Sequence, residues 1–432
     1  MNLVMFFGKK NNQRYNFMNS NLLKVFQKKI HSFFKPNRIN HDLISAPALD
    51  TIKILKKNNY DAFIVGGAIR DILMGYKPKD FDIATNATPE QVRSAFKRSR
   101  IIGRRFKIVH VIYGREIIEV STFRSKPRKK IEMSNGVLKD NEYGSIEEDA
   151  ERRDFTINAL YYDVEDKKII DFFGGLNDIQ DNQLRLIGDP KLRYKEDPIR
   201  ILRAIRFSAK LKMEIHSKTL NEINNSMEFL KSVPYSRLFD EVMKFFLTGH
   251  AEESMMKFKK YNLVNIYFPS LKNNNKIFKN FLLQSLKNTD LRIKNGKSIN
   301  PGFLLAVFLW RDVIELFEKY DKNFPHSSLA LNKAIDNTIY KQSKIFPIQR
   351  RFSITMSEIW RLQPRFNSKS SKKIYRLLNH PRFRASYDFL LLRCQSLEIS
   401  KSIGLWWTKF IESDKKNQDL LIANKKIEDI KI

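Results

Sequence analysis

The sequence predicts an α+β fold, in which a small mixed head of strands and helices precedes an all-helical remainder. Between residues 42 and 190, short strand-like runs alternate with helical patterns, and glycine-rich turns separate them. After Pro198 the strand pattern fades, and apolar residues recur three and four positions apart. The predicted strands are Ala62–Val65, Ile108–Tyr113, Ile117–Phe123 and Ala159–Val164.

Composition limits the class of protein. Of 432 residues, 42% are hydrophobic, which is enough for substantial cores and excludes wholesale disorder. The longest strongly apolar run, Phe303–Trp310, is too short for a membrane span, which needs roughly 20 residues. One cysteine, Cys394, excludes an internal disulfide framework and a multi-cysteine zinc site, and fits a reducing compartment.

The net charge points to a polyanionic partner. There are 79 lysines and arginines against 47 acidic residues, giving a formal charge of +32. An AT-biased genome rich in lysine codons would produce the same sign without any functional demand. Residues 1–41 form a basic N-terminal extension with apolar residues at helical spacing. That extension fits an amphipathic helix on a membrane surface or RNA, a transit-like presequence, or a solvated segment.

The first chemical motif follows the buried run Ala62–Val65, where Gly66 and Gly67 lead into a helical pattern. Glycines let the backbone approach a ligand closely, and the amides that open a helix favour phosphate oxygens. A tight turn without a ligand has the same pattern, in which case Arg70 and Asp71 would form a surface ion pair.

The second motif contains Asp80 and Asp82 in an extended segment. Residues two apart in a strand face the same side, so the two carboxylates converge while Phe81 and Ile83 face the core. Carboxylates on one face repel unless cations lie between them, and paired Mg²⁺ ions serve in-line nucleotidyl transfer. The motif therefore indicates a two-metal site, although solvated acidic pairs are common.

A third carboxylate is expected from a neighbouring strand. In the run that follows Arg115, Ile118 and Val120 alternate with Glu119, which makes Glu119 the candidate to complete the metal cluster or to accept the proton of the attacking hydroxyl. Glu116 and Asp163 are rivals, and an edge-strand glutamate without a catalytic role fits the pattern as well.

Two arginine-containing motifs follow. Arg152, Arg153 and Asp154 precede an apolar segment. Guanidinium forks suit a triphosphate and a carboxylate suits a ribose hydroxyl. The structural alternative is a helix start with Asp154 as the cap and Asn158 exposed.

In the second of these motifs, Asp197 and Pro198 are typical of the N-cap and first position of a helix. Arg200, Arg203 and Arg206 then follow along one side. Asp197 and Arg200 could present an acceptor and a donor fork to a base. A capped helix with a basic stripe explains the same residues.

In this order, the motifs resemble the class II nucleotidyltransferases of the polymerase beta superfamily, which comprise CCA-adding enzymes and bacterial poly(A) polymerases. The similarity is closer to the bacterial poly(A) polymerase I branch and runs from about Arg38 to Trp407. Three segments favour that branch, namely Ile101–His110, Gly144–Phe155 and His380–Arg393.

The resemblance implies a nucleotidyltransferase palm over residues 42–190, a helical neck over 191–270 that holds the base-selecting helix, and a helical body and tail over 271–432. It implies that Asp80 and Asp82 hold two Mg²⁺ ions, with ATP as substrate and Glu119 as the third catalytic carboxylate. The matched nucleotide-binding residues are Gly66, Gly67, Arg70, Arg152, Arg153, Asp154, Glu196, Asp197, Arg200 and Arg203.

The implied activity is template-independent addition of AMP to RNA 3′ ends by a cytoplasmic monomer that takes part in RNA processing. A CCA-adding enzyme is the close alternative, and a non-catalytic RNA-binding protein is the alternative from another class.

The sequence departs from that family at its end, where the chain stops without an arginine-rich tail, and in the short basic loop after Arg124. RNA affinity could instead come from Lys341–Tyr387, which has twelve basic residues against one acidic residue, Glu358. Basic residues with interleaved aromatics are typical of single-stranded RNA binding. A solvated basic face with its aromatics in the core is the alternative. The aromatics concerned are Phe346, Phe352, Trp360 and Tyr375.

Overall fold

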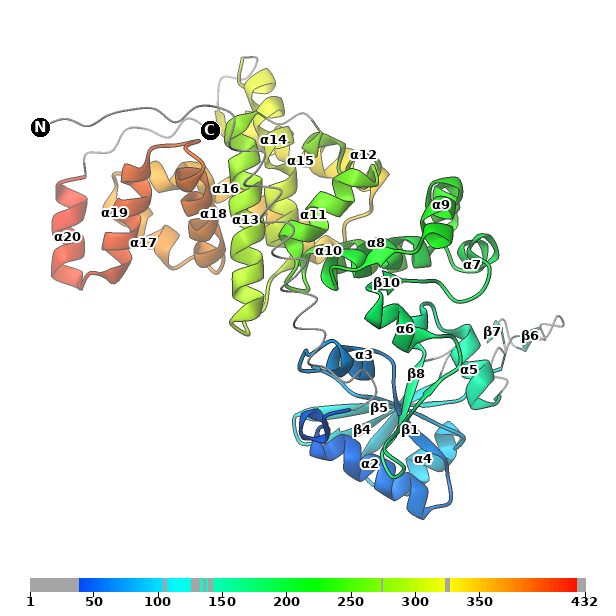
Figure 1. Ribbon diagram of the computed structural model, residues 1–432. Helices are drawn as coiled ribbons and strands as arrows, with labels where there is room; N and C mark the ends of the chain where they lie inside the picture. Colours follow the sequence, from blue (N-terminus) through cyan, green and yellow to red (C-terminus); the bar gives the residue numbers. More distant parts are fainter. Residues whose placement is uncertain are drawn as a thin grey trace, which may run out of the picture. The chain divides into compact units, whose positions relative to one another are not determined.

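The computed structural model describes residues 39–103, 107–125, 133–134, 137–138, 143–272, 275–322 and 327–425. The predicted N-terminal extension up to residue 38, most of the basic loop after Arg124 and the C-terminal end lie outside the described residues. Two compact units make up the chain (Figure 1). The head comprises the chain up to Glu196 and Met213–Asn225, and the helical unit comprises Asp197–Lys212 and the chain from Ser226 onward.

The head contains a seven-stranded mixed sheet in the order β3-β4-β5-β2-β1-β8-β9, which confirms the predicted α+β class. Strands β2 and β5 are parallel, and every other neighbouring pair is antiparallel. All four predicted strands are present, β1 and β4 with the predicted bounds and β5 and β8 within one residue of them. The strands are β1 (Ala62–Val65), β2 (Asp82–Thr85), β3 (Ser99–Ile102), β4 (Ile108–Tyr113), β5 (Glu116–Thr122), β8 (Leu160–Asp163) and β9 (Lys168–Asp171).

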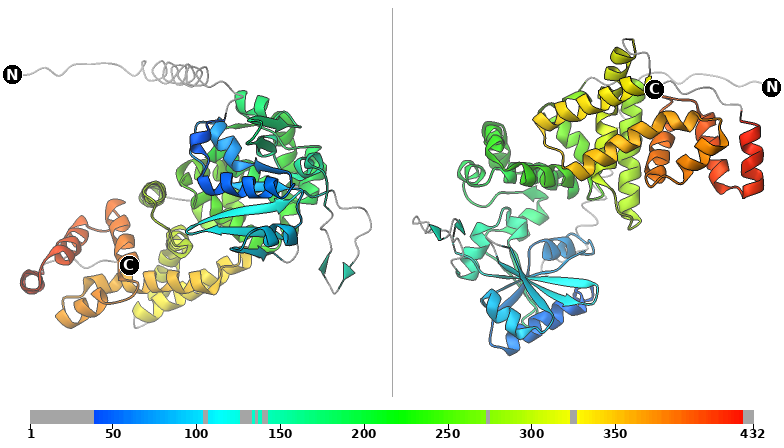
Figure 2. Two further views of the ribbon diagram at one scale, coloured as in Figure 1. Left: turned by 90° about the horizontal axis from the view of Figure 1, so that it is seen from below. Right: turned by 180° about the vertical axis from the view of Figure 1, so that it is seen from behind.

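Helices α2 (Ala46–Lys57) and α4 (Pro89–Ala95) pack together on one face of this sheet (Figures 1 and 2). At the start of each helix, a side-chain hydroxyl accepts a hydrogen bond from a free backbone amide. Ser45 does so in α2, and Thr88 does so in α4 as part of a capping box. Their apolar residues bury the sheet residues that point towards them, including Ile83. Residues that alternate with Ile83 along β2 therefore project from the opposite face, where the site lies.

The remaining elements of the head are short. They are η1 (His41–Leu43), α3 (Gly67–Leu73), β6 (Met133–Ser134), β7 (Val137–Leu138), α5 (Ile146–Arg152), η2 (Thr156–Asn158), α6 (Gly175–Gln180), β10 (Gln183–Leu184), α7 (Pro190–Glu196), β11 (Glu214–Ile215) and α9 (Ser217–Ser226), whose last residue belongs to the helical unit. Strand β10 pairs with β11 in parallel, which returns the chain to the head after an excursion into the helical unit.

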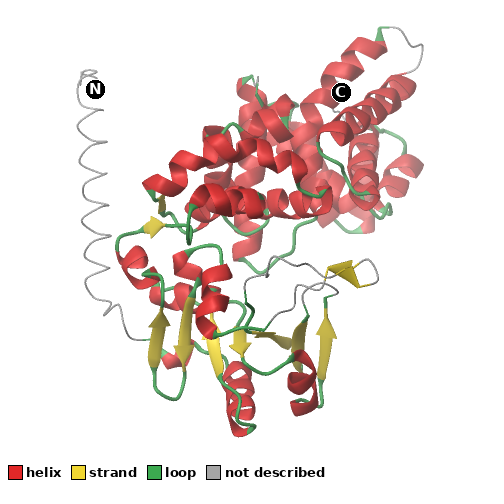
Figure 3. Cartoon of the chain, turned by 90° about the vertical axis from the view of Figure 1, so that its right-hand side faces the viewer, coloured by secondary structure: helices red, strands yellow, loops and turns green. Residues whose placement is uncertain are grey.

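In the helical unit, every described element is a helix (Figure 3). They are α8 (Ile199–Lys210), η3 (Met227–Ser232), α10 (Tyr235–Phe246), α11 (Ala251–Lys260), α12 (Leu263–Tyr267), η4 (Pro269–Leu271), α13 (Lys276–Lys294), α14 (Pro301–Asp321), α15 (Ser327–Ile345), α16 (Arg350–Leu362), η5 (Gln363–Asn367), α17 (Ser371–Leu378), α18 (Phe383–Gln395), α19 (Lys401–Glu412) and α20 (Lys415–Ala423).

The apolar run of α14 forms the centre of this unit, since Leu304–Trp310 has no exposed surface. A buried polar network crosses it. The fully buried Arg393 donates to Glu398 at 2.8 Å, and the indole of Trp310 donates to the same carboxylate at 3.0 Å. Among the described helices, none has the length and apolar character that a membrane crossing requires.

Candidate active site

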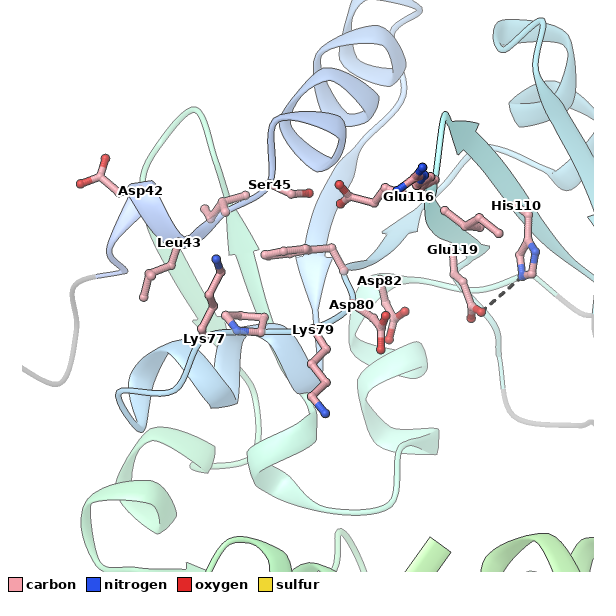
Figure 4. Close-up of a pocket in the computed structure, with 15 residues that line it drawn as sticks. Asp42, Leu43, Ser45, Lys77, Lys79, Asp80, Asp82, His110, Glu116 and Glu119 are labelled. Atoms are coloured by element: carbon pink, nitrogen blue, oxygen red, sulfur yellow. Dashed lines mark ion pairs between the residues drawn. The ribbon is translucent and has the colours of Figure 1, made fainter. Parts of the chain in front are cut away.

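Strands β2 and β5 bring the three predicted carboxylates to one pocket of the head (Figure 4). Asp82 opens β2 and lies opposite Glu119 in the parallel register with β5, so both side chains leave the same face. Asp80 precedes the strand on the same side. The predicted alternation is confirmed, because Asp80 and Asp82 are exposed while Phe81 and Ile83 are buried.

The pocket has a volume of about 900 Å³ and a lining of both polar and apolar residues. Within that lining, Asp80 and Asp82 come from the start of β2, and Glu116 and Glu119 from β5. A pocket of this size accommodates a nucleotide.

The electrostatics of Asp82 fit a site for cations. Its carboxylate opens onto the pocket yet is largely surrounded by protein, and this burial raises its pKa to about 6. The charges of Glu119 and Asp80 contribute to this raised pKa, and Arg153 acts in the opposite direction. Carboxylates that repel one another in this way are stabilised by a bound cation. Within the described ranges no three acidic, histidine or cysteine side chains converge on one point, so the aspartate pair rather than a complete triad is the candidate metal site.

The two alternatives for the third carboxylate, Glu116 and Asp163, lie in different surroundings. Glu116 lines the same pocket but lies three residues further from the aspartates along β5. Asp163 does not fit, because Lys56 binds its carboxylate at 2.8 Å and holds its pKa below the usual range although burial acts in the opposite direction. Asp163 is therefore part of a salt bridge and was a wrong alternative.

Glu119 has a neighbour that the sequence did not indicate. His110 on β4 is paired with Glu119 across the antiparallel ladder, and its Nε2 lies 3.3 Å from the Glu119 carboxylate oxygen. The dashed line in Figure 4 marks this contact. The imidazole is only 14% exposed, so it is well placed to fix the orientation of the carboxylate.

The Gly66-Gly67 turn joins β1 to α3 as predicted. Gly66 has a φ of 74°, which a side chain would strain, and a Cβ there would lie 3.2 Å from Nη1 of Arg153. Glycine thus lets this turn approach Arg153 closely.

A buried network holds Arg153 in place. Its Nε donates to the hydroxyl of Tyr161 at 3.0 Å and its Nη2 to Asp149 at 3.2 Å, and the Tyr161 hydroxyl donates to Asp149 at 2.7 Å. Arg124 lies nearby, and burial followed by the charge of Arg152 lowers its pKa. Crowded arginines of this kind favour a polyanion. Neither Asp149 nor Tyr161 was predicted from the sequence.

Arg70 and Asp154 are connected through Asn158. Arg70 is 4% exposed, and its guanidinium donates to Asp71 at 2.6 Å and to Asn158 at 2.5 Å. The amide of Asn158 donates in turn to Asp154 at 3.0 Å. The Arg70–Asp71 pair is present, but Arg70 is buried, so the alternative of a surface pair was wrong. The separate alternative in which Asn158 is exposed was also wrong, because Asn158 is buried. The helix that follows Asp154 is η2, and its N-cap residue is Phe155 with no side-chain cap, so the predicted cap at Asp154 was also wrong.

Arg193 connects the end of α5 with Glu196 in α7. It donates to the backbone carbonyls of Arg152, at 2.9 Å, and of Arg153, and it forms a 2.8 Å ion pair with Glu196. Both carbonyls lie at the C-terminal end of α5, where a cation is favoured. Glu196 thus belongs to the head, while Asp197, Arg200 and Arg203 belong to the helical unit.

In the helical unit, Asp197 does not cap a helix. Helix α8 begins at Ile199, and the Asp197 carboxylate accepts two hydrogen bonds from Arg237, at 3.0 and 3.2 Å. Arg200 and Arg203 are half-buried on α8, whereas Arg206 is buried and paired with Glu241 at 2.6 Å. The predicted cap was therefore wrong, and Arg206 is not part of a basic stripe.

The segment Lys341–Tyr387 is basic on its surface but not aromatic. All its basic residues are exposed except Arg382, which is half-buried and donates to Glu358 at 2.9 Å. Phe346 and Phe352 are buried and stack on Phe239, and Trp360 has no exposed surface. These three rings form core contacts, which contradicts their interpretation as a platform for RNA bases. The fourth predicted aromatic, Tyr375, is half-buried, and its hydroxyl donates to Asp419 at 3.0 Å.

A sheet that carries an Asp-x-Asp pair beside a glutamate, next to a glycine turn and an arginine cluster, defines a nucleotidyltransferase head. Comparison with known families narrows this class. Residues 62–185 match the poly A polymerase head domain, 212–274 the "probable RNA and SrmB- binding site of polymerase A", and 323–431 the polymerase A arginine-rich C-terminus. The last match contradicts the expectation that the end of the chain departs from the family. The chain belongs to the bacterial poly(A) polymerase I family.

Individual relatives support this assignment. Poly(A) polymerase I of Salmonella typhimurium is 40% identical over 388 residues, which cover 85% of this chain and 82% of that protein. A CCA-adding enzyme of Streptococcus agalactiae is 34% identical over 319 residues, covering 73% and 74%. The Thermotoga maritima CCA-adding enzyme, solved with tRNA, shares the fold with a TM-score of 0.58 at 20% identity, over 91% of each chain. Poly(A) polymerases are thus more similar to this chain than CCA-adding enzymes are.

Proposed function

We propose that this poly(A) polymerase adds AMP from ATP to RNA 3′ ends without a template and releases pyrophosphate. The observation that carries the proposal is the aspartate pair beside Glu119. The relatives that match most of this chain at about 40% identity are poly(A) polymerases.

The residues present fit a magnesium site. Asp80 and Asp82 would hold the ions, because both offer hard oxygen ligands and the charge on Asp82 needs a counter-ion. Two bound Mg²⁺ ions would supply activation of the RNA 3′ hydroxyl and neutralisation of the charge on the leaving pyrophosphate.

Other residues of the head would bind and orient the substrates. Arg152 and Arg153 would bind the triphosphate, and Asp154 would accept a hydrogen bond from the ribose. Gly66 and Gly67 would allow the phosphates to approach the backbone, with Arg70 supporting this turn from its buried position. Their task is to align the α-phosphorus of ATP with the attacking oxygen.

Glu119 would act on the attacking hydroxyl. Its carboxylate, oriented by His110, can accept the proton of the RNA 3′ hydroxyl as the new phosphodiester bond forms. The α–β phosphoanhydride bond of ATP breaks in the same step, and pyrophosphate leaves.

Base selection is proposed for Glu196, Asp197, Arg200 and Arg203. A carboxylate and a guanidinium together can pair with the edge of one base and reject another. The two hydrogen bonds from Arg237 fix the orientation of Asp197, which favours a single choice of base. We expect that choice to be adenine.

The alternative function is CCA addition, which the Streptococcus agalactiae relative supports at lower identity. Unstructured RNA offered with ATP alone separates the two, because a poly(A) polymerase should extend it by long tails. Dependence on both tRNA and CTP would contradict the proposal. A cytoplasmic location, a monomeric state and a role in RNA processing remain predictions.

The catalytic role of the aspartates is tested by Asp80→Ala. Incorporation of AMP should be abolished, while RNA binding, measured by gel shift, should be retained. Persistent incorporation would refute the metal assignment, and an inactive wild-type protein that still binds RNA would favour a non-catalytic RNA-binding function.

A further inference from the structure

The helical unit contains a second pocket, separate from the catalytic carboxylates. It has a volume of about 410 Å³ and lies between η4, α14 and α15. Asp312 and Leu316 line it from α14, and Thr338 and Gln342 from α15. None of these residues belongs to the motifs assigned to catalysis or base selection.

The inner wall of this pocket contains a polar group that the fold does not satisfy. Thr338 is 2% exposed, and within the described part of the chain its hydroxyl has no hydrogen-bond partner. Gln342 beside it is fixed by a 2.8 Å hydrogen bond from its amide to the carbonyl of Tyr267. A buried hydroxyl without a partner is unfavourable unless a ligand or water completes it.

Asp312 adds a half-buried carboxylate to the same wall. Burial raises its pKa to about 6, an effect that the neighbouring Ser270 hydroxyl offsets in part and Glu315 reinforces. The carboxylate is therefore largely ionised at neutral pH and is a strong hydrogen-bond acceptor. Perturbed acids in concave sites mark candidate ligand sites.

The rim is mostly cationic, because its two lysines outnumber Glu315, whose carboxylate is paired with Arg311 at 2.6 Å. Lys319 and Lys341 line the pocket and are exposed, and Leu316 and Ile345 supply apolar surface between the rim and the floor. A simple cation would be repelled by the two lysines, and a simple anion by Asp312. The lining fits a molecule with hydroxyl donors at one end, an anionic group at the other and an apolar ring between them.

We propose that this pocket binds a ribonucleotide unit, with the ribose hydroxyls at Asp312 and Thr338, the phosphate at Lys319 and Lys341, and the base against Leu316 and Ile345. The same chemistry is present in free AMP and in one nucleotide of an RNA strand. A ribose 2′ hydroxyl is what distinguishes RNA from DNA at such a site. The proposal is independent of the polymerase activity, because it involves no residue of the head.

Photolabelling of the full chain with 8-azido-AMP in EDTA, followed by peptide mapping, tests the proposal. We expect labelled peptides from α14 and α15, in addition to any from the head. AMP should compete with this labelling and dAMP should compete about tenfold less well, as expected for one lost hydrogen bond. Competition by oligo(A) would identify an RNA strand as the source of the nucleotide, and competition by AMP alone would identify a free nucleotide.

One double variant and two controls locate the site. Asp312→Asn combined with Thr338→Val changes the side-chain volumes little, and it should reduce the labelling of α14 and α15 about tenfold. Asp336→Asn, on the exposed surface of α15, should leave it unchanged. Asp80→Ala should also leave it unchanged while abolishing AMP incorporation, which separates this proposal from the polymerase function.

Absence of label from α14 and α15 would overturn the proposal, as would full labelling of the double variant. If the double variant does not fold, the comparison of AMP with dAMP on the wild-type protein decides. Equal competition by the two nucleotides would refute a ribose-binding site.

Discussion

Tyr161→Phe removes a single oxygen atom from the network that holds Arg153. Tyr161 has no exposed surface, and its hydroxyl accepts from Arg153 at 3.0 Å and donates to Asp149 at 2.7 Å. Each hydrogen bond to a charged group contributes about 1.5–3 kcal/mol net, and Asp149 keeps its direct contact with Arg153. We therefore expect the free energy of unfolding of the head to fall by about 2–4 kcal/mol.

The same substitution should weaken ATP binding, because Arg153 is the proposed triphosphate ligand and loses one of its anchors. An increase of about tenfold in the KM for ATP corresponds to about 1.4 kcal/mol. Urea denaturation measures the first effect, and steady-state AMP incorporation at varied ATP measures the second. The effect on kcat should be smaller than the effect on KM, because the aspartates and Glu119 are unchanged.

Tyr162→Phe is the matched control. Tyr162 is the next residue, is 1% exposed, and bonds His41 at 2.5 Å rather than any residue of the site. Loss of the Tyr162 hydroxyl should lower the free energy of unfolding by about 1 kcal/mol and leave the KM for ATP unchanged. Equal effects of the two substitutions on stability and on KM would refute the role assigned to the Arg153 network.

Four further predictions follow from the structure. Since burial raises the pKa of Asp82 to about 6, its charged form destabilises the metal-free head above that pH, and Asp82→Asn in EDTA should raise the melting temperature at pH 8 but not at pH 5. His110→Leu should lower kcat about tenfold with the KM for ATP unchanged, whereas His110→Gln, which keeps a donor, should recover most of the activity. Arg200→Ala should reduce the preference for ATP over CTP, and an unchanged ratio would remove that residue from base selection. Glu398→Ala leaves the buried Arg393 without its carboxylate and should cost about 3–5 kcal/mol in urea denaturation.

The sequence predicted the structure correctly where the alternation of polar and apolar residues along a strand determines it. A period of two along β2 and β5 placed Asp80, Asp82 and Glu119 on the exposed side and Ile83 in the core, and the structure confirms this. The period does not determine which strand lies beside β2. The pairing of Asp82 with Glu119 depends on a parallel register between distant segments, so Asp163 could not be excluded from the sequence.

The supporting residues were missed for a different reason. Asp149 and Tyr161 belong to α5 and β8, and only the folded sheet brings their side chains to Arg153. Arg193 similarly reaches back to carbonyls some forty residues earlier in the chain. No spacing rule predicts such contacts, because a buried tyrosine and a charged helix residue are ordinary features of any sequence.

In the helical unit, the composition of one segment led to a wrong prediction of its surface. The segment Lys341–Tyr387 is basic, but Phe352 and Trp360 lie on the inward faces of their helix with Met356, whereas Arg361 is exposed. Helical periodicity contained this information, since the rings recur with the apolar residues rather than with the lysines and arginines. Interleaving along the chain does not place rings and charges on one surface.

The nature of the product tests the central claim most directly. An unstructured RNA incubated with all four nucleoside triphosphates and Mg²⁺, and then sequenced at its 3′ end, should carry long homopolymeric A tails, and the Asp82→Asn variant should add none. Addition of cytidines, extension limited to a few nucleotides of a tRNA, or equal activity of the variant would contradict the account.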